Sequence, residues 1–249
     1  MTLVYSDASS FACGGCAFRV DSKEYDLFFQ AFSSSESVSG SNARELLAIL
    51  YGMKSFRASL MGKVVKVFTD NKNAASISAK GSNSLRLHAI ALEIFAYCAA
   101  HDIPLEVEWI PRSLNSYADS VSRVIDYDDW AVSTIFVHHV SSIFGPLDVD
   151  RFAASLSAKC ERFYSKFWCP GCEGVYAFSA SWGGVNNYLV PPVFLVARTL
   201  AHLETSRARG TLIVPKWPSA SFWYYLFPLG HPQDSVSRII EFSDPSGNF

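Results

Sequence analysis

Four acidic residues stand where predicted elements of secondary structure begin or end. Asp7 and Asp70 each close a short run of branched and aromatic residues, and Glu45 and Asp119 lie in two predicted helices. Acids are poor strand formers, and burying one without a partner costs free energy. Carboxylates gathered at one sheet edge, without histidine or cysteine, favour Mg²⁺ or Mn²⁺. Two such ions about 4 Å apart catalyse in-line phosphoryl displacement.

Other interpretations of these acids remain open. Glu45 follows Asn42 by three residues and could complete a helix cap, while Asp119 could complement a helix dipole. A rival triad of Asp7, Asp70 and Glu106 leaves 35 residues (71–105) between its last two members, which is the spacing of integrase and transposase cores. Glu106 lies in a predicted strand, however, whereas that class needs a glutamate on a helix.

The elements that must position these acids follow from hydrophobic periodicity and turn residues. A three-stranded meander is expected at residues 2–6, 14–20 and 24–30, with turns at Gly14-Gly15 and Asp21-Ser22. Helices are expected at 42–60, 71–79, 84–101 and 115–124, and strands at 63–70 and 104–109. The order βββαβααβα predicts a mixed five-stranded sheet with flanking helices.

The apolar pattern restarts near residues 126–130, which predicts two domains, 1–126 and 127–249. In the second half, strands are expected at 149–155, 162–168, 174–182, 210–217 and 237–242, and a helix at 192–208. This alternation predicts a second, smaller α/β domain.

Composition excludes some classes of protein. The net charge of −2 gives no bulk sign of nucleic-acid binding, although a local basic groove stays possible. No apolar run approaches the roughly 20 residues that span a bilayer, and no secretion signal precedes the first strand. We therefore expect an intracellular protein, cytoplasmic or nuclear, that has no membrane partner and is a fragment of a longer polypeptide.

The six cysteines favour a reducing compartment over a disulfide framework. Cys169 and Cys172 form a Cys-Pro-Gly-Cys motif. Structural zinc, with Cys160 or the Cys13/Cys16 pair completing the ligands, is one interpretation of this motif. Reduced thiols in a turn are the default.

The stretches YSDAS, NARELLAI, VFTDN and WIPRSLNSYADSVSR resemble the ribonuclease H domain of retroelements, in the form found in DIRS and Ngaro retrotransposons. The resemblance covers roughly residues 1–125 and implies a ribonuclease H-like fold. It also implies endonucleolytic hydrolysis of the RNA strand of RNA–DNA hybrids with two Mg²⁺ or Mn²⁺ ions. The natural partner would be a reverse transcriptase domain of the same polyprotein, in reverse transcription.

The resemblance further implies a role for each acid. Asp7 would bridge both ions, and Asp119 would complete the ion that activates water. Glu45 and Asp70 would hold the ion that stabilises the leaving 3′ oxygen. In many ribonucleases H a mobile histidine lies about ten residues before the last aspartate, but here Trp109 holds that position.

Three polar residues match positions that contact the substrate in that family. Asn42 and Asn71 are expected to contact the hybrid, and Ser9 to contact a phosphate. A competing class is a domesticated, non-catalytic module that binds nucleic acid without cutting it.

Residues 148–226 resemble the domain that follows ribonuclease H in those same elements, which is similar to phage-type adenine-N6 DNA methyltransferases. The resemblance is carried by stretches such as DVDRFAASLSAKCERFYSKF and RGTLIVPKWPSASFW. This resemblance implies a Rossmann-like, methyltransferase-type domain. In such enzymes an Asn or Asp before Pro-Pro holds the adenine amino group, but here Val190 precedes Pro191-Pro192 and Val193 follows. We therefore expect a degenerate domain without catalysis.

Overall fold

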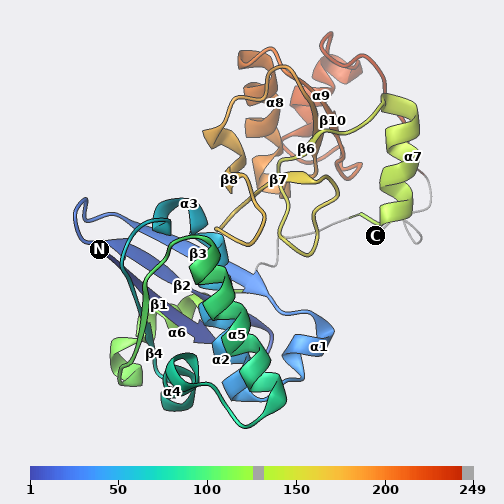
Figure 1. Ribbon diagram of the computed structural model, residues 1–249. Helices are drawn as coiled ribbons and strands as arrows, with labels where there is room; N and C mark the ends of the chain where they lie inside the picture. Colours follow the sequence, from blue (N-terminus) through green and yellow to red (C-terminus); the bar gives the residue numbers. More distant parts are fainter. Residues whose placement is uncertain (126–131, 243–249) are drawn as a thin grey trace. The chain divides into compact units, whose positions relative to one another are not determined.

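The computed structural model describes residues 1–125 and 132–242 (Figure 1). The chain folds as two compact units. The first comprises Met1–Ile125 with Phe167–Cys172, and the second comprises Asp126–Lys166 with Glu173–Phe249. The domain boundary expected near residues 126–130 lies outside the described residues. No described helix has the length and apolar character needed to cross a membrane.

The first unit is built on a mixed five-stranded sheet of order β3-β2-β1-β4-β5. Its strands are β1 (Thr2–Ala8), β2 (Ala12–Arg19), β3 (Tyr25–Ala31), β4 (Val65–Thr69) and β5 (Leu105–Trp109). The first three form an antiparallel meander, and β4 and β5 run parallel to β1. The predicted fold class, a mixed five-stranded sheet with flanking helices, is confirmed.

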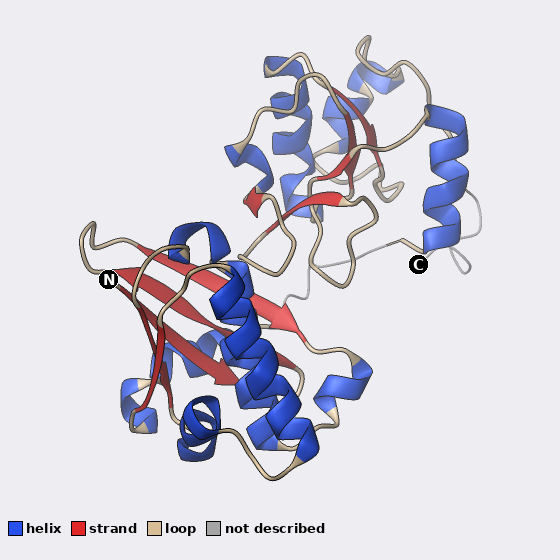
Figure 2. Cartoon of the chain, in the orientation of Figure 1, coloured by secondary structure: helices blue, strands red, loops and turns tan. Residues whose placement is uncertain are grey.

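Helices lie against both faces of this sheet (Figure 2). They are α1 (Ser34–Ser37), α2 (Ser41–Ser55), α3 (Arg57–Leu60), α4 (Lys72–Lys80), α5 (Leu85–Ala100), the 3₁₀ turn η1 (Arg112–Leu114) and α6 (Ser116–Ser122). Val4 of β1 packs beneath Gly52 of α2, whereas Asp7 is hydrogen-bonded to Ser122 of α6. Because alternate residues of a strand point to opposite faces, α2 and α6 cover opposite sides of β1.

The prediction that Gly14 and Gly15 form the first turn is wrong. The turn lies at Ser9–Phe11, where the Ser9 amide donates to the carbonyl of Ala12 at 2.9 Å, and both glycines lie inside β2. Serine hydroxyls can stabilise turns by hydrogen bonds to nearby backbone, as the Ser9 hydroxyl does here with Ala12.

The two glycines are needed for close packing across β2. A Cβ atom at Gly15 would lie 1.8 Å from the carbonyl oxygen of Tyr5 on β1. A Cβ atom at Gly14 would lie 2.8 Å from Cγ1 of Val121 on α6. The missing side chain at Gly14 therefore lets α6, which carries Asp119, lie directly on the strand.

A short segment from the second half of the chain completes the outer edge of the sheet. Trp168 forms a parallel bridge with Phe28 of β3. Its amide donates to Leu27 at 3.1 Å, and its carbonyl accepts from the Phe29 amide at 3.0 Å. These bonds satisfy backbone groups that an edge strand would otherwise leave unpaired.

The second unit contains five short parallel strands in the order β10-β9-β6-β7-β8. They are β6 (Val149–Asp150), β7 (Arg162–Ser165), β8 (Gly174–Val175), β9 (Asn186–Leu189) and β10 (Arg209–Leu212). Helices α7 (Thr134–Phe144), α8 (Val196–Thr205) and α9 (Trp223–Leu226) accompany them, with 3₁₀ turns η2 (Ala177–Ser179), η3 (Val193–Leu195) and η4 (Pro228–Gly230). The strand predicted at 237–242 is wrong, because these residues form no strand.

Strand β9 was not predicted, because it begins with two asparagines, which are poor strand formers. The amide of Asn187 is buried, donating to the Trp182 and Arg209 carbonyls and accepting from Nε of Arg151 at 2.7 Å. Arg151 is only 3% exposed and lies over the ring of Trp182. Polar residues therefore hold the centre of this sheet together, which hydrophobic periodicity cannot indicate.

We expect Gly15→Ala to destabilise the first unit by roughly 1–3 kcal/mol or more, because its Cβ collides with fixed backbone. Urea denaturation followed by circular dichroism measures this change. Gly40→Ala is the matched control, since a Cβ atom at Gly40 meets nothing within 4 Å and its φ of −62° suits alanine. Equal losses in both variants would contradict the packing role of Gly15.

Candidate active site

The structure brings three of the four predicted acids together. Carboxylate oxygens of Asp7, Glu45 and Asp70 lie within 4.8 Å of one another. Asp7 lies near the end of β1, Asp70 directly follows β4, and Glu45 projects from α2. Because β1 and β4 are parallel neighbours, their carboxyl ends meet at one edge of the sheet.

Glu45 is the most strongly perturbed member of this cluster. It is 5% exposed, and burial, followed by the charges of Asp7 and Asp70, raises its pKa to about 8. Its carboxylate accepts hydrogen bonds from the Ala8 amide and the Thr69 hydroxyl, but Oε2 has no partner among the described residues. Helix α2 has Gly40 at its N-cap, so Glu45 does not complete a cap with Asn42.

Asp7 is as deeply buried as Glu45. It is 4% exposed, and the Ser122 hydroxyl donates to its Oδ2 at 2.6 Å. Burial raises the pKa of Asp7 most, the bond from Ser122 opposes that shift, and the charges of Asp70 and Asp119 add to it. The serine therefore ties α6 to the cluster.

This arrangement fits a divalent cation. The three acids offer hard oxygen donors, and the orphaned Oε2 of Glu45 is a buried acceptor that a cation would satisfy. A cation would also remove the repulsion among the carboxylates, which otherwise favours proton uptake. Asp7, Glu45 and Asp70 could thus hold one ion directly.

The fourth acid, Asp119, lies outside this three-residue cluster. Arg112 donates to its Oδ1 at 2.5 Å, and Arg123 donates to Oδ1 at 3.0 Å and to Oδ2 at 3.1 Å. These bonds, first of all that from Arg123, lower the pKa of Asp119. Asp119 is nevertheless close enough to raise the pKa of Asp7.

The two arginines were not predicted as site residues. Both lie in the stretch WIPRSLNSYADSVSR, and Arg123 follows Asp119 by four residues on the same helix. Residues at that spacing are neighbours on a helix surface. This spacing was the available signal for Arg123, whereas Arg112 is brought in only by the η1 turn.

The three predicted substrate contacts are engaged in local structure. The Ser9 hydroxyl donates to the Ala12 carbonyl at 3.0 Å and accepts from the Ala12 amide at 3.1 Å. Asn71 caps α4 by accepting from the Ala74 amide at 2.9 Å, and its amide donates to Asn42 at 3.1 Å. Asn42 and Asn71 thereby join α2 to α4 beside the acids.

Glu106, the third member of the rival triad, is not brought to the cluster. It lies on β5 with its carboxylate exposed, 3.7 Å from Nζ of Lys66. At the neighbouring edge, Trp109 donates from Nε1 to the Asp70 carbonyl at 2.9 Å, and Lys72 lies over its ring. Trp109 is thus fixed beside the acids.

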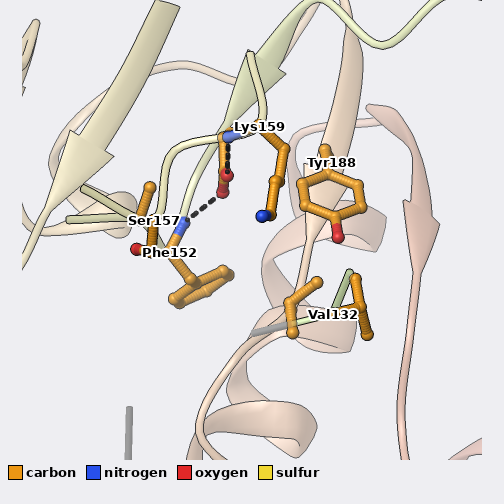
Figure 3. Close-up of a pocket in the computed structure, with 8 residues that line it drawn as sticks. Val132, Phe152, Ser157, Lys159 and Tyr188 are labelled. Carbon is orange, nitrogen blue, oxygen red and sulfur yellow. Dashed lines mark hydrogen bonds between the residues drawn. The ribbon is translucent and has the colours of Figure 1, made fainter. Parts of the chain in front are cut away.

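A small cavity lies in the second unit, where the strand order reverses between β6 and β9 (Figure 3). Ligands of open α/β sheets bind at such a switch point. Here the dashed lines in Figure 3 mark amide hydrogen bonds from Phe152 and Lys159 to the carboxylate of Asp150. The cavity, also lined by Tyr188 and Val190, measures about 10 Å³, room for a single water.

The raised pKa of Glu45 predicts a pH-dependent stability. The folded state holds a proton that the unfolded state releases above about pH 4.5, so in metal-free buffer the free energy of unfolding should fall as the pH rises through about 8. Urea denaturation with chelator at pH 5 to 8 measures this fall. Glu45→Gln should flatten it and the exposed-site control Glu106→Gln should not; identical curves for both variants would contradict this origin.

Comparison with models of known protein families gives a match to the first part of the chain. The family model "RNase H-like domain found in reverse transcriptase" matches residues 1–97. No curated protein matches the chain.

Several solved structures are similar to the first half of the chain. RNase H1 from Halobacterium salinarum is 15% identical, with 48% of this chain and 92% of that chain covered and a TM-score of 0.42. LC11-RNase H1 in complex with RNA/DNA hybrid is 14% identical, with 49% and 93% covered and a TM-score of 0.40. The prototype foamy virus protease–reverse transcriptase is 12% identical, with 50% and 21% covered and a TM-score of 0.36. Residues 1–97 are thus similar to the RNase H-like domains found in reverse transcriptases.

Proposed function

We propose that the first unit is a metal-dependent endonuclease that hydrolyses the RNA strand of RNA–DNA hybrids. The observation that carries this proposal is the cluster of the buried Asp7 and Glu45 with the half-buried Asp70, in which one carboxylate oxygen of Glu45 has no partner among the described residues. The match to an RNase H-like domain found in reverse transcriptase supports a place beside a reverse transcriptase. The sequence resemblance noted above is the ground for proposing a retrotransposon polyprotein of the DIRS or Ngaro type. Such a protein would act in the cytoplasm or nucleus.

The four acids divide the work according to their positions. Asp7 belongs to the three-residue cluster, and the charge of Asp119 also raises its pKa. Its position between the cluster and Asp119 would suit it to hold both of two Mg²⁺ or Mn²⁺ ions. Glu45 and Asp70 would complete one ion position, and Asp119 the other. When bound, the two ions supply Lewis-acid activation of water and stabilisation of the leaving oxygen.

Arg112 and Arg123 compete with a second ion for the carboxylate of Asp119. These guanidinium groups have exposed fractions of 66% and 52%, so they remain accessible to solvent and to substrate. Guanidinium groups bind phosphate in a bidentate manner. If the two arginines bound backbone phosphates of the substrate instead of Asp119, they would hold the substrate. The Asp119 carboxylate would then be released for its catalytic role.

Asn42, Asn71 and Ser9 are the proposed contacts with the hybrid, and Asn42 lies in a nearby groove. This groove, of about 310 Å³, is lined by Asn42, Arg86 and the first turns of α2 and α5. Backbone amides at helix N-termini attract phosphate. Recognition of the RNA strand would then depend on helix shape and 2′-hydroxyls, not on sequence.

A non-catalytic hybrid-binding module is the second candidate. The two ion pairs on Asp119 favour it, because they occupy the carboxylate that a second ion would need. An integrase-type triad finds less support, since Glu106 is paired with Lys66 and stands apart from the acids.

For the second unit we propose a degenerate methyltransferase-like domain that binds no methyl donor. The apolar side chain of Val190 follows β9, where an amide or carboxylate acceptor would be needed, and the cavity at the strand switch holds about one water. The carboxylate of Asp150, which lines this cavity, accepts hydrogen bonds from the backbone amides of Phe152 and Lys159.

Cleavage of a labelled RNA–DNA hybrid with Mg²⁺ tests the nuclease proposal. We expect cleavage of the RNA strand by the native chain and none by Asp70→Asn, because Asp70 is a proposed metal ligand. Glu106→Gln is the matched control and should cleave normally.

Each other outcome would assign a different function or a different active site to this chain. Binding of the hybrid without cleavage by the native chain would establish the binding module. Loss of cleavage in Glu106→Gln, with retention in Asp119→Asn, would establish the integrase-type triad. Equal cleavage by the native chain and Asp70→Asn would place the activity elsewhere.

Isothermal titration of S-adenosylmethionine into the full chain tests the second unit. We expect no binding heat, because the cavity is too small for a nucleoside. An active phage-type adenine-N6 methyltransferase serves as the positive control. Saturable binding, or methyl transfer to DNA, would overturn the proposal.

A further inference from the structure

The motif Cys169-Pro170-Gly171-Cys172 forms a tight turn in the first unit. The Cys172 amide donates to the Cys169 carbonyl at 3.2 Å, and Gly171 has a φ of +86°. Proline at the second position and a left-handed glycine at the third are the residues of a type II turn, whose end Cα atoms lie less than about 7 Å apart. A disulfide requires a Cα separation of about 4.4–6.8 Å, so this backbone already suits one.

The two sulfur atoms also face each other. The Cys169 amide donates to Sγ of Cys172 at 3.5 Å, and the Cys169 thiol is hydrogen-bonded to the same sulfur. These bonds favour the thiolate and lower the pKa of Cys172 to about 7. Burial instead raises the pKa of the other four thiols that lie outside the motif, those of Cys13, Cys16, Cys98 and Cys160.

Exposure divides the pair into two roles. Cys172 is partly exposed, whereas Cys169 is only 3% exposed. Attack on a dissolved oxidant therefore falls to Cys172, and Cys169 is placed to resolve the product. Reactive thiols in Cys-X-X-Cys motifs combine these features of accessibility and thiolate character.

We propose that Cys169 and Cys172 are a redox-active dithiol that closes to an intramolecular disulfide on reaction with a small-molecule disulfide such as oxidised glutathione. The Cys172 thiolate attacks one sulfur of glutathione disulfide, forming a mixed disulfide and releasing one glutathione thiolate. The Cys169 thiolate then attacks the Cys172 sulfur, its proton passing to solvent, and the second glutathione leaves. The protein is oxidised by two electrons, and glutathione disulfide is reduced to two glutathione molecules.

Zinc binding is the alternative for this motif. A thiolate zinc site needs four ligands, or three with a water. Among the residues that the structure describes, no histidine, carboxylate or further cysteine joins these two sulfurs in a metal-binding group. The redox pair is therefore the better-supported chemistry.

The disulfide would act on the strand pairing that precedes it. Trp168, directly before Cys169, is held to β3 by hydrogen bonds with Leu27 and Phe29. A covalent closure of the turn restricts the conformations in which this segment is detached from β3. Oxidation should thus slow the opening of the outer edge of the sheet.

Equilibration of the folded full chain with glutathione buffers of increasing oxidising strength tests this proposal. Alkylation and peptide mass spectrometry should find a Cys169–Cys172 disulfide, with loss of two hydrogen atoms, while Cys13 and Cys98 stay reduced. Slower amide hydrogen exchange at Trp168 and Phe29 in the oxidised form should accompany it.

Variants assign the two roles. Cys169→Ser should accumulate glutathione on Cys172, and Cys172→Ser should leave Cys169 unmodified, with Cys98→Ser as the control that behaves like the native chain. A folded chain that never forms this disulfide would overturn the proposal. So would stoichiometric zinc, found by native mass spectrometry and lost in Cys172→Ser.

Discussion

The burial of neighbouring carboxylates is the constraint on which the first unit depends. Asp7 and Glu45 are 4% and 5% exposed, and with Asp70 they lie within one cation's reach. Burial removes Asp7 and Glu45 from water, and the charges of neighbouring acids raise the pKa of both. Only protons or cations relieve such a cluster, so the edge of the sheet is built to bind one of them.

The surrounding structure is arranged to hold this unfavourable cluster in place. The bare backbone at Gly14 admits α6, and Ser122 on that helix donates to Asp7. Asp119 on the same helix is neutralised from outside by Arg112 and Arg123. The site thus has an inner side, where three carboxylates gather, and an outer side, where the carboxylate is paired with two arginines.

Whereas the acids of the first unit repel one another, the buried polar side chains of Asp150, Arg151 and Asn187 in the second unit are hydrogen-bonded to partners within the protein. Arg151 and Asn187 satisfy each other in the centre of the sheet, and Asp150 accepts two backbone amides. Asp150 lines the cavity of about 10 Å³ at the strand switch. A sheet whose strand order suits ligand binding is here stabilised by its own polar residues instead.

Local sequence patterns indicated most elements of the first unit and the three acids that the structure brings together. Branched and aromatic runs ending in Asp7 and Asp70 indicated two strands that present carboxylates, and helical spacing placed Glu45 towards the core. Such periodicity depends only on residues close together in the sequence, so it can be recognised without coordinates. The strands of the second unit were harder to predict, because they are short. Strand β9 also begins with two asparagines, and some of the hydrogen-bond partners of these residues lie far along the chain.

Tertiary structure alone decided the rest. Gly14 and Gly15 suggested a turn, but distant atoms of Tyr5 and Val121 show why they lie within a strand. Asp119 belonged to the predicted quartet, yet its position beside two arginines depends on the path of η1 and the seating of α6. The pairing of Trp168 with β3 joins residues about 140 positions apart. Close approach, charge pairing and edge pairing depend on distances between remote residues, and a sequence does not state those distances until the chain has folded.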